Sequence, residues 1–361
     1  MADEREVRCE VDIECWKNPK LMETAEKPVE TEVPFRDHLV SVVTPVYNGA
    51  DCLPKMLDSV LVQSWRQIEM ILVDDGSSDN TLQVAESYRE KFAARGYGFR
   101  IVEGEHENAA AAISRGLPFV AGEYLIWPDS DDVLAPASVE KRVRFLEENP
   151  GYQCVRSLPY YFGWETGEPR PPDEPQGELS REYLFWDILE TKTFVCCGCY
   201  MLRSEPFFAI YPERRIPAYG VGQNFQMLLP FLYRHKCPTI REPLYGVAVR
   251  LGSHSRMPLT QAQEEKKYKD YESLIDEIAA LCGIDSPAEQ NRIRCWKANR
   301  RYRISLKYRR WREVFRALGQ VRRYGKVQAG NAVKELLWAL FHNSWVWKKL
   351  YPAYRRFFHD K

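Results

Sequence analysis

The chain has 361 residues, of which 45% are hydrophobic and 13% aromatic, and its formal net charge is zero. This composition indicates a globular protein of one large or two modest domains, and it excludes a collagenous or intrinsically disordered chain. A run of about 18 apolar residues, as a bilayer-spanning helix needs, does not occur. The charged start Met-Ala-Asp-Glu-Arg-Glu does not fit a secretory signal, so we expect a cytoplasmic protein.

The zero net charge conceals two ends of opposite sign. Residues 1–38 carry about 11 acidic and 6 basic side chains, whereas residues 292–361 carry about 20 basic and 3 acidic ones. We therefore expect an acidic leader over 1–37 and a basic C-terminal region, helical over 258–361, with different partners at the two ends.

Strands and helices alternate from residue 39 onward. Short β-branched runs predict strands, and amphipathic spacing predicts helices between them. The predicted elements are strand 39–46, helix 53–63, strand 68–73, helix 81–94, strand 99–102, helix 108–115 and strand 124–127. Such alternation implies right-handed βαβ units, and so an α/β fold with a Rossmann-like, mostly parallel sheet covered by helices on both faces.

Beyond residue 150 the pattern is less regular. The Pro- and Gly-rich segment 151–180 predicts an exposed loop. The elements predicted after it are helix 182–189, strand 193–202, helix 224–235, two short strands around Tyr245, and only helices from 262 onward. Three of the ten cysteines, Cys196, Cys197 and Cys199, match neither a zinc pattern nor a disulfide scaffold, and we expect free thiols packed in the strand.

Polar side chains follow three of the predicted strands. They are the turn 44–48, the pair Asp74 and Asp75, and the cluster Asp129, Asp131 and Asp132. Ligands of open α/β sheets bind beyond the carboxyl ends of the strands, where these groups would meet. Clustered carboxylates repel one another unless a cation lies among them, and hard ions such as Mg²⁺ and Mn²⁺ prefer oxygen ligands. The alternatives are a solvated acidic turn before a helix near Ser138 and helix capping by the aspartate pair.

Three segments together resemble the family 2 glycosyltransferases, which are inverting nucleotide-sugar enzymes of GT-A fold. The segments are Val-Val-Thr-Pro-Val-Tyr-Asn-Gly (42–49), Ile-Leu-Val-Asp-Asp-Gly-Ser-Ser-Asp-Asn-Thr (71–81) and Gly-Glu-Tyr-Leu-Ile-Trp-Pro-Asp-Ser-Asp-Asp (122–132). The resemblance is strong over 39–150 and weaker as far as 255. It implies metal-dependent transfer of a sugar from a nucleotide-diphosphate donor, with a UDP-sugar expected first, to a surface glycan or lipid-linked glycan.

The resemblance also implies a division of the GT-A domain, 38–257, into a nucleotide-sugar part, 38–150, and an acceptor side, 151–257. Asp74 would accept a hydrogen bond from the base, Asp75 would shape the turn, and Asp129 would lie near the sugar or ribose. Asp131 would be the main protein ligand of a Mn²⁺ or Mg²⁺ ion that bridges the diphosphate. Also implied for the donor site are Thr44, Pro45 and Tyr47 around the nucleoside, Arg115 as a weaker candidate, and Asp129 and His254 as further metal ligands.

The family places an acidic pair that opens a helix, and includes the general base, about 90 residues after the metal motif. Here Gln223 and Asn224 occupy those positions. An amide does not take a proton from a hydroxyl at neutral pH. Three explanations stay open: the amides position the acceptor while another carboxylate is the base, the acceptor is already anionic, or catalysis is weakened. The last of these leads to the alternative of a non-catalytic nucleotide-sugar or glycan-binding protein.

The C-terminal tail combines helical spacing of apolar residues with aromatic and basic side chains. Val333, Leu336, Leu337, Leu340 and Phe341 follow the helical period, and Trp345, Lys348 and Arg355 lie beyond them. This pattern predicts a helix at an anionic membrane interface, at the inner face of the cell membrane, or a helix packed on the catalytic domain. The basic stretch 301–312 has no nucleic-acid recognition fold around it, so no nucleic-acid partner is expected.

Overall fold

The computed structural model describes residues 34–250 and 259–324. The chain divides into two compact units, Met1–Pro34 and Phe35–Lys361, and every described helix and strand belongs to the second. The predicted leader up to residue 33, His254, and the predicted amphipathic tail from residue 325 lie outside the described residues.

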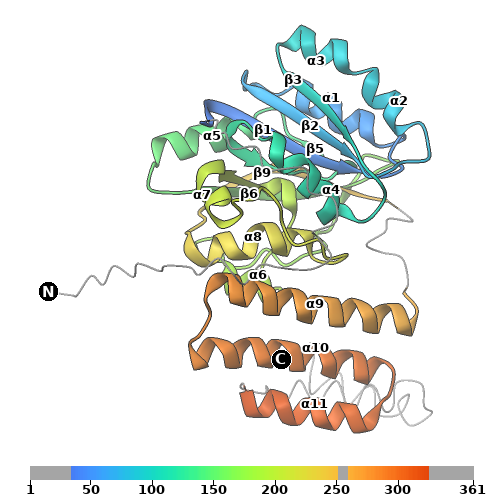
Figure 1. Cartoon of the computed structure of the whole chain (residues 1–361), viewed down its shortest axis with the longest axis vertical. Coiled ribbons are helices and arrows are strands. Elements are labelled where there is room, and N and C mark those ends of the chain that lie inside the picture. The colour runs from blue at the N-terminus through green and yellow to red at the C-terminus, as the bar shows by residue number, and fades with distance from the viewer. Residues whose placement is uncertain (1–33, 251–258, 325–361) are drawn as a thin grey trace, which may run out of the picture. The chain divides into compact units, whose positions relative to one another are not determined.

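A sheet of nine strands forms the centre of the second unit, and its first half is parallel (Figure 1). The parallel strands are β1 Arg36–Val46, β2 Ile68–Asp74, β3 Gly98–Glu103 and β4 Gly122–Ile126. β1 pairs in parallel with both β2 and β4, and β2 pairs with β3. Val40, Val42 and Val43 of β1 are fully buried, as expected of a strand covered on both faces. The β-branched runs of the sequence are therefore the interior of this half of the sheet.

The second half of the sheet has mixed directions. Its strands are β5 Val133–Leu134, β6 Cys154–Gly163, β7 Pro169–Arg170, β8 Tyr200–Arg203 and β9 Thr239–Val249. The strand order is β3-β2-β1-β4-β8-β6-β9-β5, with β7 on β6. β8 is antiparallel to both β4 and β6, whereas β6 and β9 are parallel. Through β5, the acidic turn that follows β4 is paired to β9 far along the chain.

Helices follow most of the strands, and the predicted α/β fold is confirmed. Before residue 250 they are α1 Leu53–Leu61, α2 Thr81–Glu86, α3 Arg89–Arg95, α4 Ala109–Gly116, α5 Ser138–Glu148, α6 Phe185–Leu189, α7 Ser204–Ile210 and α8 Gln223–Arg234. α4 starts where the Asn108 side chain accepts hydrogen bonds from the amides of Ala110 and Ala111, each at 3.1 Å. Such a cap satisfies amides that the first turn leaves without partners.

Four predicted features are wrong in detail. The two short strands expected around Tyr245 are one continuous strand, β9. The helix expected over 81–94 is broken into α2 and α3, and at the break Tyr88 is buried with its hydroxyl 3.3 Å from the Pro54 carbonyl oxygen of α1. The loop expected over 151–180 contains strand β6, whose pairing with β9 shifts register on either side of Leu158. Pro159 is tolerated at such an irregularity, although a proline in the sequence argues against a strand.

The strand expected over 193–202 is shorter than predicted. Only Tyr200–Arg203 is a strand, and Cys197–Cys199 forms a 3₁₀ turn, η4. The thiols are free, as predicted, and Cys197 and Cys199 are buried. The Gly198 backbone lies directly against the Tyr245 ring, so a β-carbon at this position would overlap the ring.

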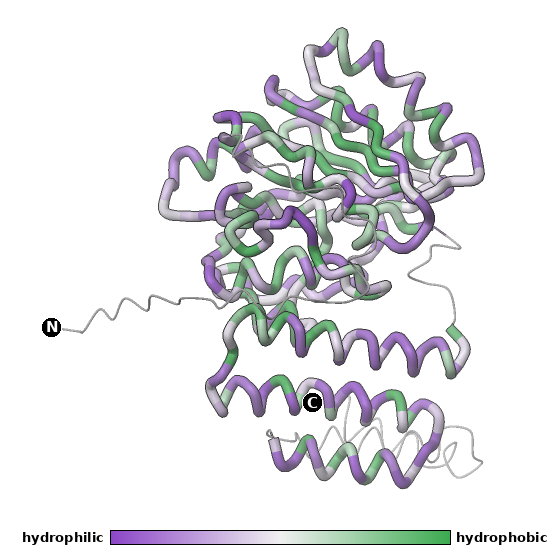
Figure 2. The backbone as a smooth tube through the Cα atoms, viewed as in Figure 1, coloured by the Kyte–Doolittle hydropathy of each residue, from purple (hydrophilic) through white to green (hydrophobic). Residues whose placement is uncertain are grey.

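Three long helices follow residue 259, as predicted: α9 Gln261–Cys282, α10 Pro287–Lys307 and α11 Trp311–Tyr324. α9 packs on the start of α8, where Gly222 has a φ of +61° and a β-carbon would lie 2.9 Å from both Tyr271 and Leu274. Trp296 of α10 donates a hydrogen bond of 2.6 Å to the Leu189 carbonyl. Polar and apolar residues alternate along all three helices (Figure 2). None of the helices in the described ranges has the length and apolarity needed to cross a membrane.

Candidate active site

Hydrogen bonds join the loops that follow β1 and β2 at the carboxyl end of the sheet. The Asn48 amide donates to Ser77 Oγ at 2.9 Å, and the Ser78 amide donates to Asn48 Oδ1 at 2.8 Å. The Gly49 amide donates to Thr81 Oγ1 at 2.9 Å. Asn48 has a φ of +49°, a conformation that asparagine tolerates better than most residues. These bonds hold the Thr44–Asn48 turn and the Asp74–Asp75 pair in one rigid edge.

Two buried oxygen atoms at this edge have no hydrogen-bond partner among the described residues. They are Thr44 Oγ1 and Asp74 Oδ1, on residues that are 0% and 2% exposed. The other carboxylate oxygen, Asp74 Oδ2, accepts a bond of 2.9 Å from the Ser77 amide. Leaving a buried acceptor without a donor costs about 1–3 kcal/mol. The pair is therefore suited to receive an N–H or O–H group of a ligand.

In contrast to Asp74, Asp75 has protein hydrogen-bond partners on both carboxylate oxygens. Its carboxylate accepts bonds from the Arg115 guanidinium, from His106 Nδ1 at 2.9 Å and from the Glu107 amide at 3.3 Å. The contact between Arg115 and Asp75 needs glycine at position 104, because a β-carbon there would collide with the Arg115 side chain. Arg115 was predicted to contact the donor, but the structure places it on Asp75, which agrees with a turn-shaping role for that carboxylate.

A stacked pair of aromatic rings lies beside these aspartates. The rings of Tyr47 and His106 are 3.8 Å apart at an interplanar angle of 15°, and Tyr47 is 36% exposed. His106 also bonds to Asp75, so the stack belongs to the same sheet edge. Tyr47 was predicted from the sequence, whereas His106 was missed. Its only sequence signal is its position soon after the third predicted strand.

The acidic turn after β4 is anchored through Asp132. Tyr245 donates to Asp132 Oδ2 at 2.6 Å, and the Ala248 amide donates to Oδ1 at 2.8 Å. Burial, followed by the charges of Asp129 and Asp131, raises the pKa of Asp132 well above its usual range. The Tyr245 hydroxyl also accepts a bond of 3.2 Å from the Asp129 amide. Asp132 and Tyr245 therefore hold the turn in place.

The amide pair on α8 faces this acidic turn. Gln223 Nε2 donates to Asp129 Oδ1 at 3.3 Å, and Asn224 Oδ1 accepts a bond of 3.2 Å from the Trp127 indole nitrogen. Burial and the Asp131 charge raise the pKa of Asp129 to about 6. The structure thus brings together four residues that the sequence analysis singled out separately: Asp129, Asp131, Gln223 and Asn224.

The carboxylates of the turn fit a divalent cation that takes few protein ligands. Both oxygens of Asp132 accept hydrogen bonds from the protein, so Asp129 and Asp131 are the carboxylates considered for the cation, and Asp129 is also bonded by Gln223 and by the Cys197 thiol. Within 34–250 and 259–324 no three or more His, Cys, Asp or Glu side chains are grouped to hold a metal ion. Mg²⁺ is usually held by one or two carboxylates together with substrate phosphates and water. A cation here would also relieve the repulsion that raises the Asp129 pKa.

An ion pair lies near Asp131 at the start of α1. Arg250 Nη1 is 3.1 Å from Asp51 Oδ2. Burial and the charges of Asp131 and Asp51 raise the pKa of the Cys52 thiol to about 12, and Arg250 opposes them, so all four residues share one neighbourhood. The Arg250 guanidinium is thus held by a protein carboxylate.

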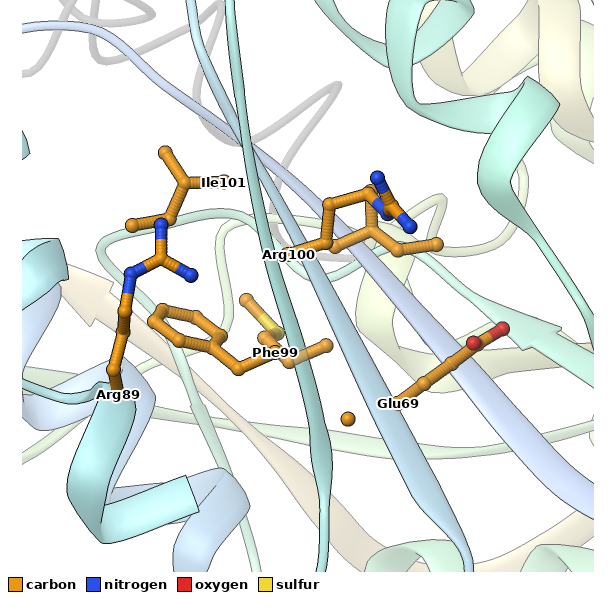
Figure 3. Close-up of a pocket in the computed structure, with 8 residues that line it drawn as sticks. Glu69, Arg89, Phe99, Arg100 and Ile101 are labelled. Atoms are coloured by element: carbon orange, nitrogen blue, oxygen red, sulfur yellow. The ribbon is translucent and has the colours of Figure 1, made fainter. Parts of the chain in front are cut away.

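A cavity of about 410 Å³ lies elsewhere, along β2 and β3 (Figure 3). It is lined by Glu69, Met70, Ile71, Arg89, Gly98, Phe99, Arg100 and Ile101. Figure 3 shows Arg89 beside Phe99 on one side of the β3 ribbon and Arg100 on the other. None of the predicted site residues lines this cavity, so we do not assign it to the site at the carboxyl end of the sheet.

The fold and the polar edge define an α/β protein of GT-A type. Residues 41–209 match the model of glycosyl transferase family 2, so this stretch of the chain is a family 2 glycosyltransferase domain. The prediction of family and fold made from the three sequence segments is thereby confirmed.

Relatives with similar sequences are also glycosyltransferases by name. An uncharacterized glycosyltransferase of Rickettsia typhi is 36% identical over 174 residues, which cover 47% of this chain and 51% of that protein. Glycosyltransferase GlyA of Streptococcus pneumoniae is 32% identical over 265 residues, covering 71% of this chain and 36% of GlyA. The chain thus matches about half or less of the length of these relatives.

The solved structure of S. aureus TarS residues 1–349 in complex with UDP-GlcNAc has a similar fold. Its TM-score is 0.59, and the match covers 88% of this chain and 92% of that one. At 18% sequence identity this likeness concerns the fold alone.

Proposed function

We propose that this protein is an inverting glycosyltransferase that moves a sugar from a nucleotide-diphosphate donor to a hydroxyl acceptor, with a divalent metal ion. The observation that carries the proposal is the acidic turn of Asp129 and Asp131 at the same sheet edge as Asp74 and the Tyr47–His106 stack. Residues 38–150 would bind the donor and 151–257 the acceptor. The family of the chain supports the activity.

The donor's base would lie against the exposed Tyr47 ring, with Asp74 Oδ1 accepting its N–H group. The unpartnered oxygens of Asp74 and Thr44 support this placement, since a base N–H would satisfy a buried acceptor. A UDP-sugar is the donor proposed first, because TarS, which has a similar fold, was solved with UDP-GlcNAc. The acceptor proposed is a surface glycan or a lipid-linked one.

A bound Mn²⁺ or Mg²⁺ would act as a Lewis acid that neutralises the charge developing on the leaving diphosphate. Asp131 and Asp129 are its proposed protein ligands, with His254 as a third. The chain's own contribution is to fix these carboxylates. Tyr245 anchors the turn through Asp132, and Gln223 holds one oxygen of Asp129. Carboxylates held in this way need little reorganisation when charge develops in the transition state.

The contacts of the amide pair support the first of the three explanations for the missing acids. Gln223 and Asn224 bond to Asp129 and Trp127, so they join α8 to the acidic turn. We propose that they orient the site, while another carboxylate takes the acceptor proton. The second candidate function is a non-catalytic nucleotide-sugar- or glycan-binding protein, which is favoured only by the amides Gln223 and Asn224 in place of the family's acidic pair.

Replacing Gln223 by glutamate tests this role. Gln223→Glu puts a carboxylate where an amide now donates to Asp129, and like charges at this distance repel. We expect kcat to fall at least about tenfold. Asn224→Asp is the companion variant, because it adds a carboxylate to the same pair while keeping the oxygen that accepts from Trp127. A gain of activity in Gln223→Glu would instead support the explanation of weakened catalysis.

The activity itself is tested by the release of free nucleotide diphosphate from UDP-, GDP-, CDP- and dTDP-sugars, with and without Mn²⁺. We expect release that requires Mn²⁺ and selects one nucleotide. Asp74→Asn should lower kcat/KM for that donor about 10- to 100-fold, chiefly through KM, because a buried acceptor of the base is lost. Binding of a donor by calorimetry without release, in the presence of a range of glycan acceptors, would favour the binding protein.

A further inference from the structure

The outermost of the three C-terminal helices, α11, has two different faces. Val314, Ala317 and Val321 are buried, and Val314 and Ala317 share a small core with Tyr302 of α10. The spacing of these residues, three and four apart, is that of one helix face. α10 lies between α9 and α11 (Figure 1). The apolar face of α11 is therefore already used for packing.

The opposite face of α11 is exposed and basic. We call this set the arginine face: Arg312, Phe315, Arg316, Arg322 and Arg323. The other four members follow Arg312 by three, four, ten and eleven residues, and at these spacings all five side chains project from one side of a helix. Phe315 is 62% exposed, among the most exposed large hydrophobic side chains in the described parts of the chain.

The four arginines of this face are not neutralised by the described part of the chain. Neighbouring basic residues are paired: Arg301 of α10 with Glu272, Lys307 of α10 with Glu264, and Arg310, between α10 and α11, with Glu265. No described carboxylate forms an ion pair with Arg312, Arg316, Arg322 or Arg323, and the one acid of α11, Glu313, pairs with Arg310. Like charges on one helix face repel each other, and an anionic partner on this face would relieve that repulsion.

We propose that the arginine face of α11 docks on an anionic phospholipid surface. Charge complementarity supplies the attraction, and a cluster of four arginines suits lipid phosphates. The exposed Phe315 ring among them favours a membrane over a soluble polyanion, because transfer of an apolar ring from water into the headgroup region lowers the free energy. The sequence beyond α11 continues with Trp345, Trp347 and Lys348, a composition typical of interfaces. The attachment is electrostatic and reversible, since the apolar face of α11 is not available for insertion.

The test is co-sedimentation of the full chain with phosphatidylcholine vesicles, with and without about 30% phosphatidylglycerol. We expect binding only to the anionic vesicles, and loss of most of it between about 0.1 M and 0.5 M salt. Each arginine near such a surface contributes about fivefold in affinity, so Arg312→Gln with Arg316→Gln should weaken binding about 30-fold. Phe315→Ala should weaken it further without changing its salt dependence.

The matched control carries the same charge change on another surface. Lys141→Gln with Arg144→Gln alters two exposed residues of α5 and should leave vesicle binding unchanged. Unfolding curves of all variants check that they are folded. Equal losses in control and test variants, or full binding in the α11 variants, would overturn the proposal. So would complete competition by polyphosphate with no effect of Phe315→Ala, which would identify a soluble polyanion as the partner. Vesicle binding is measured without donor, so its failure is distinct from a failure of the transferase activity.

Discussion

Asp131→Ala is expected to lower kcat/KM for the sugar donor by about 10³-fold or more. The metal ion that this carboxylate is proposed to hold would stabilise the leaving diphosphate by several kcal/mol. Asp131 lies on the turn that Tyr245 anchors through Asp132, and its charge raises the pKa of both other aspartates. Its removal takes away the main proposed ligand of the cation and leaves the anchor intact. The measurement is Mn²⁺-dependent release of nucleotide diphosphate from the preferred donor.

A readout besides activity separates this role from a structural one. Calorimetry should show that Asp131→Ala binds the nucleotide but has lost the dependence of that binding on Mn²⁺. The midpoint of thermal unfolding should change little, since Asp131 is only partly buried and Asp132 carries the anchoring bonds. Glu105→Ala, an exposed carboxylate in the loop after β3, is the matched control and should retain activity. Full Mn²⁺-dependent release by Asp131→Ala would contradict the proposed metal site.

Gly198→Ala is expected to destabilise the protein by about 3 kcal/mol or more, since it both overpacks the core and displaces a bonded tyrosine. A β-carbon at Gly198 would lie 2.0 Å from Cε2 of Tyr245 and 2.4 Å from its Cζ. The Gly198 carbonyl accepts a hydrogen bond of 2.7 Å from the buried Arg142, so the backbone cannot easily shift away from the ring. The Tyr245 ring must then move, and its bonds to Asp132 and Asp129 break.

Urea unfolding measures this effect, and Gly151→Ala is its control. A β-carbon at Gly151 meets nothing within 4 Å, so the control should change the free energy of unfolding by less than about 0.5 kcal/mol. Transferase activity of Gly198→Ala should fall below that of the control even where the protein is folded, because the acidic turn loses its anchor. Wild-type stability of Gly198→Ala would mean that Tyr245 can relocate at little cost, and that it does not anchor the turn.

The parallel half of the sheet follows from local sequence. The apolar runs of β1, β2 and β4 are mostly buried, and a short apolar run of this kind stands out in a sequence without any knowledge of its neighbours. The three motifs at the ends of these strands also follow, because parallel strands bring their carboxyl ends to one edge. The family, and the amides Gln223 and Asn224 where that family has acids, could be predicted from the resemblance of the three segments to family 2 glycosyltransferases.

Only the tertiary structure decided which of these residues bond to a neighbour and which do not. Asp75 and Arg115 are 40 residues apart, and Asp132 and Tyr245 are 113 apart, so no local pattern pairs them. The sequence shows three similar aspartates in the turn after β4. Long-range contacts bury Asp132 as an anchor and join Asp129 to Gln223, because burial and hydrogen-bond partners are set by strands and helices that meet only in the folded chain.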